Sequence, residues 1–208
     1  LKKDPKNPYA LTDFGRFWLA RREYIQARSR LEAAMNSPRA KILTDSELAD
    51  IYRMLGGLLE RAGDIDQALD YYKKALNKSP DDTRNLLSLA IGLCAAGNSQ
   101  EAVELLEPCA EKFDATKSGA PAEIAMRALE HYTFAVALEE TGFLDEALSS
   151  YNRALKLAQM ANVTDNAGII DRAGMALERL EDIFDARQAH EEKRVNEDDA
   201  RKKKSPTL

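Results

Sequence analysis

Side chains that bind metals are few in this chain of 208 residues, which has two histidines and two cysteines. A zinc site needs ligands in pairs at short spacing along the chain. His131 and His190 lie far apart in sequence, and neither Cys94 nor Cys109 has a second cysteine two residues away. We therefore expect no metal site and no cofactor.

The motifs of catalysis are also missing. The chain has no phosphate-binding loop, dinucleotide fingerprint or nucleophile elbow. The carboxylates of Glu139 and Glu140, and of Asp81 and Asp82, are adjacent in sequence rather than opposed, which is typical of solvated helix faces and helix starts. We expect no enzymatic activity within this segment.

Composition narrows the class of protein. With 44% apolar residues, ten glycines and seven prolines, the chain favours helices. A net charge of −5 argues against nucleic acid as a partner, and no apolar run approaches the roughly 18 residues of a membrane span. Both cysteines fall on apolar helical stripes, where a thiol behaves as a small hydrophobe, so we expect a reducing, cytoplasmic location.

One segment recurs along the chain. Residues 60–80, "ERAGDIDQALDYYKKALNKSP", align with "CAAGNSQEAVELLEPCAEKFD" and "EETGFLDEALSSYNRALKLAQ", and two looser copies follow the same frame. Each copy is centred on one alanine, which we call its key alanine, and residues at one distance from the key alanines form a column. The key alanines of the five copies are Ala27, Ala68, Ala102, Ala147 and Ala186.

The columns have packing explanations. Small residues twelve before the key alanine let two helices approach closely, and a glycine five before it, such as Gly63, supplies the left-handed backbone that ends the first helix. Tyr72 and Tyr151 share the column four after the key alanine, which indicates a core position rather than a catalytic one. The small-residue column contains Gly15, Gly56, Ala90, Ala135 and Gly174.

This pattern resembles the tetratricopeptide repeat. The resemblance covers residues 8–194 and is most complete in the second copy, which closes with Pro80. It implies an all-α protein, a right-handed α-solenoid of about five helix pairs. The fifth copy has Glu181 in place of the glycine and His190 in place of the aromatic residue, so we expect it to act as a polar cap.

The two ends carry separate predictions. Pro5 has the phase of Pro80, so residues 1–7 are interpreted as the tail of a preceding repeat. We expect this end to expose Tyr9, Leu11 and Phe14 and to allow self-association through them. Residues 195–208 are predicted to be a charged, flexible tail.

Three local signals concern helix ends. "TDSE", from Thr44 to Glu47, predicts a capping box, and Pro121 suits the first turn of a helix. Pro108 falls within the second helix of the third copy and should kink or shorten it.

The resemblance also implies a binding surface, because the first helices of successive repeats line the concave side of such a solenoid. The lining columns lie fifteen and eleven residues before the key alanine, and no copy has there the lysine and asparagine with which chaperone-binding members clamp a peptide carboxylate. With neighbouring charges included, the predicted partner-binding residues are Arg16, Arg53, Leu87, Ile91, Tyr132, Val136, Glu139, Asp171 and Met175.

We therefore predict a protein–protein interaction module or scaffold that holds a protein or peptide segment in this groove, as part of a larger protein or complex. The alternatives are a substrate-docking repeat region of a larger enzyme and a co-chaperone-like domain without the usual clamp. The segment between Cys109 and Pro121 could instead fold over the apolar stripe and make it core.

The charges predict a polarity for the partner. Arginines lie toward the N-terminal end of the stripe and carboxylates toward the C-terminal end, so a segment with an apolar centre, one acidic end and one basic end would fit. The arginines are Arg16, Arg53 and Arg84, and the acids are Glu139, Glu140, Asp171 and Glu178.

Overall fold

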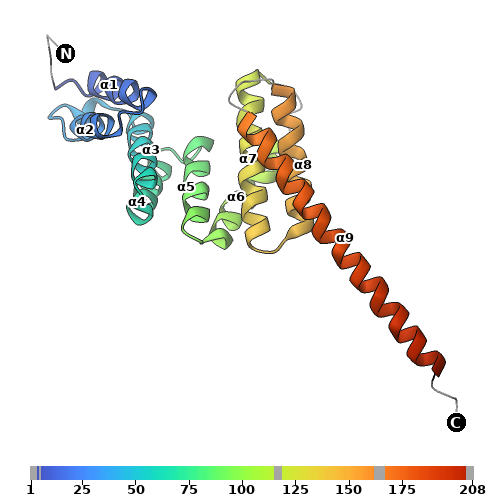
Figure 1. The fold of residues 1–208 in the computed structure, drawn as a ribbon. Helices are drawn as coiled ribbons and strands as arrows, with labels where there is room; N and C mark the ends of the chain where they lie inside the picture. Colours follow the sequence, from blue (N-terminus) through green and yellow to red (C-terminus); the bar gives the residue numbers. More distant parts are fainter. Residues whose placement is uncertain (1–3, 5, 115–118, 162–166, 205–208) are drawn as a thin grey trace. The chain divides into compact units, whose positions relative to one another are not determined.

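The computed structural model describes residue 4 and residues 6–114, 119–161 and 167–204. Regular structure in these ranges is helical, which confirms the all-α class (Figure 1). A short 3-10 turn, η1 (Ala40–Ile42), precedes α3. The helices are α1 (Pro8–Ala20), α2 (Tyr24–Met35), α3 (Asp45–Arg61), α4 (Ile65–Lys78), α5 (Thr83–Ala95), α6 (Ser99–Asp114), α7 (Pro121–Glu140), α8 (Leu144–Ala161) and α9 (Ala167–Lys204).

The chain divides into two compact units, Leu1–Lys112 and Phe113–Leu208, which we call the first and the second unit. In the first unit α1 packs against α2 and α3 against α4, and α5 follows against α4. In the second unit α8 packs against both α7 and α9. Helices that are neighbours in sequence are thus neighbours in space within each unit, as in a repeat protein.

The turns inside the helix pairs share one geometry. Gly63, Gly97 and Gly142 have φ angles of 84°, 77° and 87°, in the left-handed region that favours glycine. The first copy makes the same turn with Arg22, whose φ is 61°. After α3, the Gly63 N–H donates to the Glu60 carbonyl (2.9 Å) and the next N–H to the Leu59 carbonyl (2.9 Å), which satisfies the end of the helix.

The close approach of paired helices is also as predicted. The key alanines of the first four copies are fully buried. A Cβ atom added to Gly56 would lie 2.6 Å from Cε1 of Tyr72 and 3.2 Å from the Ala68 carbonyl oxygen. A larger residue in this column would therefore force α3 and α4 apart.

The fifth copy does not form a helix pair. α9 is one continuous helix, and its key alanine, Ala186, is exposed. Its N-terminal half is packed, since Ala173, Leu177 and Leu180 are buried. Glu181 stands where the other copies have their left-handed residue, and glutamate is a good helix former, so the helix continues.

The same helix runs into the predicted charged tail. α9 extends to Lys204, so most of the segment from residue 195 is helical. The sequence from Glu191 to Lys204, "EEKRVNEDDARKKK", is rich in helix-forming Glu, Lys and Arg with opposite charges at helical spacing. Residues 205–208 lie outside the described ranges.

The N-terminal end agrees with the prediction in part. Tyr9 and Phe14 are each 40% exposed, but Leu11 is 4% exposed and joins a buried cluster with Leu31 and Leu55. The prediction for Leu11 was wrong because this position faces α2 and α3 rather than the end of the stack. Pro5 lies outside the described residues.

The other helix-end signals have mixed outcomes. Thr44 and Glu47 form the predicted capping box, with the Thr44 N–H donating to Glu47 Oε2 at 2.8 Å, and Pro121 begins α7. Pro108 does not shorten its helix, because α6 continues to Asp114. The carbonyl of Glu104, which loses its donor at Pro108, belongs to an exposed residue that water can reach.

Candidate functional site

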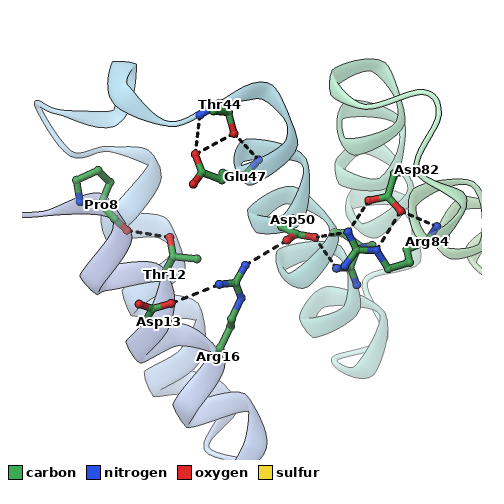
Figure 2. Close-up of polar contacts among 10 residues, drawn as sticks. Pro8, Thr12, Asp13, Arg16, Thr44, Glu47, Asp50, Asp82 and Arg84 are labelled. Carbon is green, nitrogen blue, oxygen red and sulfur yellow. Dashed lines mark hydrogen bonds and ion pairs between the residues drawn. The ribbon is translucent and has the colours of Figure 1, made fainter. Parts of the chain in front are cut away.

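In the first unit, the carboxylate of Asp50 lies close to arginines from three helices (Figure 2). Asp50 of α3 accepts from Nη2 of Arg53 at 2.6 Å and from Nη2 of Arg16 of α1 at 3.1 Å. Nη2 of Arg84, at the start of α5, lies 3.7 Å from Oδ1 of Asp50. Asp50 thus links the first helices of three successive copies.

The same arginines have further acidic partners. Arg16 donates to Asp13 at 3.3 Å, and Arg84 holds Asp82 with bonds of 2.6 and 3.0 Å. The guanidinium of Arg84 lowers the pKa of Asp82, so this pair stays charged at neutral pH. The structure therefore brings the predicted residues Arg16 and Arg53 together, but their charges are compensated within the unit.

The two apolar lining residues predicted in α5 differ in their exposure to solvent. Ile91 is 37% exposed, as a lining residue should be, whereas Leu87 is 2% exposed and belongs to the core. Leu87 lies one helical turn before Ala90, a close-packed and fully buried position, so its aliphatic side chain is drawn into the same interior. Leu87 is thus corrected from a surface residue to a core residue.

In the second unit, a pocket of about 490 Å³ lies among α7, α8 and α9. Four of the predicted partner-binding residues line it: Tyr132, Val136, Glu139 and Met175. The remaining lining residues are Glu140, Tyr151, Arg172, Ala176 and Arg179. Asp171 is exposed on α9 but does not line the pocket.

A hydrogen-bonded cluster forms one wall of this pocket. The Tyr151 hydroxyl donates to Oε2 of Glu139 at 2.8 Å, and Arg179 of α9 donates to Oε1 from Nη2 at 2.6 Å and from Nε at 3.1 Å. Burial and the bond to Glu139 raise the pKa of Tyr151, which keeps its hydroxyl protonated as a donor. Tyr132 meets Tyr151 edge to face at a centroid distance of 5.8 Å.

The tyrosine–glutamate bond occurs in both units. In the second copy the Tyr72 hydroxyl donates to Oε2 of Glu60 at 2.5 Å, and these two residues occupy the same columns as Tyr151 and Glu139. The sequence placed both tyrosines in the core but missed their acceptors. The recurring separation of twelve residues between glutamate and tyrosine was the signal that could have found them.

These pairings compensate some of the charges behind the predicted polarity. Glu139 is bound by Arg179, and the arginines of the first unit are bound by Asp50 and Asp82. Asp50 and Arg179 were not among the predicted residues, because each acts on a helix other than its own. Asp171 and Glu178 are exposed on α9, and the predicted polarity of the partner stays a prediction.

Two observations concern other site classes. Within the described ranges, no group of three or more His, Cys, Asp or Glu side chains is placed to hold a metal ion. Among the helices described, none combines the length and apolar character needed to cross a membrane. The segment between Cys109 and Pro121 lies largely outside the described residues and side chains, so its covering of the stripe stays untested.

Comparison with known proteins identifies the repeat. A family model for the tetratricopeptide repeat matches residues 59–115. This part of the chain matches the tetratricopeptide repeat. The match spans the end of α3 and all of α4, α5 and α6, which are the second helix of the second copy and both helices of the third.

Solved structures similar to this repeat chain agree on the fold. The apo form of RapI has a TM-score of 0.71 at 15% identity, over 86% of this chain and 64% of RapI. MamA from Desulfovibrio magneticus RS-1 has a TM-score of 0.56 at 15% identity, over 88% of this chain and 97% of the MamA chain. A Rap protein complexed with Competence and Sporulation Factor has a TM-score of 0.64 at 14% identity, over 86% of this chain and 50% of that protein. No curated protein matches the sequence significantly.

Proposed function

We propose that this chain is a protein–protein interaction module that holds a segment of a partner protein, with the pocket of the second unit as one contact site. The observation that carries the proposal is that Tyr132, Val136 and Met175, chosen as lining residues by their columns, meet in one pocket. Met175 is 68% exposed, and an exposed methionine beside tyrosine is an adaptable apolar contact.

The comparisons support this proposal without deciding it. The tetratricopeptide repeat is typically a non-enzymatic interaction module, and one of the similar folds is a Rap protein complexed with Competence and Sporulation Factor. The pocket volume of about 490 Å³ falls within the range of sites that take a small ligand or a few side chains. We propose no catalytic role for the chain and a cytoplasmic location, in keeping with Cys94 being a thiol.

Self-association through the N-terminal end is also a proposal. Phe17 is 48% exposed, whereas Leu58 and Ala137, in the same column of later copies, are buried. At Leu58 the preceding helix α2 covers this column, so the first copy presents an apolar surface where another helix could pack.

Selection from a random peptide library displayed on phage tests the pocket. We expect the intact chain to enrich peptides and Met175→Asp to lose them, because a charge would then stand in the apolar wall. Met160→Asp is the matched control, since Met160 is 55% exposed on α8 and does not line the pocket. Equal enrichment by Met175→Asp and the wild type would rule the pocket out.

A further inference from the structure

We infer that the pocket of the second unit selects a segment in which an acidic residue stands beside an apolar one, with Arg172 binding the acidic side chain. This inference rests on the proposed function and names the chemistry of its partner. It follows from which charges in the pocket are already compensated and which one is not.

Four charged residues line the pocket. Both oxygens of Glu139 are occupied, one by Arg179 and the other by the Tyr151 hydroxyl. Glu140 has an interaction of its own within the protein. Arg172, by contrast, forms no ion pair with any residue that the structure describes. Arg172 is therefore the charged lining residue for which the described residues supply no ionic partner.

Arg172 is placed to act together with the apolar wall. Met175 and Ala176 follow it by three and four residues on α9, so the three side chains share one face of the helix. The guanidinium lies beside Gly168, one turn earlier, where an added Cβ atom would be in ordinary contact with Nη2 of Arg172 at 3.4 Å. Arg172 is exposed, so its five N–H donors are available to a partner.

Other partner chemistries fit less well. A basic side chain would approach Arg172 and Arg179, while the carboxylate of Glu139 is bound by Arg179 and Glu140 has an interaction of its own. A wholly apolar segment would cover Arg172 without giving it a partner, which costs free energy. A carboxylate beside an apolar side chain satisfies both parts of the pocket, and a guanidinium binds a carboxylate through two parallel hydrogen bonds.

The test uses random heptapeptides joined to phage coat protein through their C-termini, so that every carboxylate they offer comes from Asp or Glu. We expect the wild-type chain to enrich peptides with an Asp or Glu next to an apolar residue. Arg172→Gln should lose this preference, and Lys156→Gln, an exposed residue of α8 outside the pocket, should keep it.

An enriched peptide is then synthesised in two forms, one with its acidic residue and one with the matching amide. By fluorescence polarisation, the acidic form should bind the wild type about tenfold or more tightly than the amide form, as expected for a hydrogen bond to a charged group. In Arg172→Gln the two forms should bind alike. Because Arg172 is exposed and forms no ion pair with a described residue, this variant should melt as the wild type does.

The outcomes separate the two proposals. Enriched peptides without acidic residues, or an undiminished preference in Arg172→Gln, would overturn the role of Arg172 while leaving peptide binding intact. Failure of the wild type to enrich any peptide beyond Met175→Asp would overturn the proposed function, and this inference with it.

Discussion

In the second copy of the repeat, α3 ends at Arg61 and the chain reverses through Gly63 into α4, whereas in the fifth copy α9 continues through the same column without a break. The two copies begin alike, since both bury an apolar stripe before this point. They diverge at one position, where glycine adopts a φ of 84° and Glu181 stays helical. This column is where the helix pair and the one long helix diverge.

The first copy shows that glycine itself is not required. Arg22 adopts a φ of 61° and makes the same pair of hydrogen bonds after α1, with its N–H donating to the Leu19 carbonyl at 2.9 Å. Its apolar second helix, with Ala27 and Leu31 fully buried, offsets the strain. The second half of the fifth copy has no such stripe, so nothing compensates a left-handed residue at Glu181.

Substitution of the key alanines should give the largest difference in stability effect between the second and the fifth copy. Ala68 is fully buried between α3 and α4, so we expect Ala68→Leu to lower the free energy of unfolding by about 1–3 kcal/mol. Ala186 is exposed, and Ala186→Leu should change the free energy of unfolding by no more than about 0.5 kcal/mol. Urea denaturation followed by circular dichroism measures both. A loss of similar size in the two variants would mean that residues after Ala186 form a packed second helix.

The small-residue column should give effects of opposite sign. Gly56→Ala places a Cβ atom 2.6 Å from the Tyr72 ring and should destabilise by about 1–2 kcal/mol. Nothing lies within 4 Å of a Cβ at Gly174, so Gly174→Ala should stabilise by about 0.5–1 kcal/mol through helix propensity. Melting temperatures would report both changes. Destabilisation by Gly174→Ala would show that another helix packs closely against this part of α9.

The aromatic column should show the smallest difference. Tyr72→Phe leaves Glu60 without the hydroxyl donor at 2.5 Å, and we expect it to cost about 1 kcal/mol. His190 occupies the same column of the fifth copy but is exposed on α9, so His190→Phe should be neutral within about 0.5 kcal/mol. Chemical denaturation of the two variants provides the comparison. If Tyr72→Phe were as stable as the wild type, water would be replacing the hydroxyl at Glu60.

Much of the fold was predictable because its signals are local. The spacing of Gly56, Gly63 and Ala68 predicts where two helices pack closely and where the first of them ends. The capping box at Thr44 is recognised from only four residues. The continuity of α9 was harder to predict, although Glu181 and His190 showed that the fifth copy departs from the repeat pattern. A break in a column does not by itself say whether the chain turns differently or does not turn at all.

The candidate site was predictable only in outline. Tyr132, Val136 and Met175, which the columns selected, line one pocket, because residues at equal distances from the key alanines occupy equal places on their helices. They misplaced Leu87, and they gave no indication that Arg179 would hold Glu139 or that Asp50 would collect three arginines. Such pairs join residues of different helices, and their formation depends on side-chain directions that column spacing does not contain.

The sequence by itself determined the helices, their turns and the residues between paired helices, since these depend on periodicity and on the backbone preferences of a few small residues. Only the tertiary structure decided which charges are compensated. Asp50 and Glu139 are acids of equal formal charge to any others along the chain, yet each is bound by arginines from other helices, while Arg172 is left without a carboxylate among the described residues. The reason is that electrostatic attraction falls with the distance between atoms, and packing sets that distance.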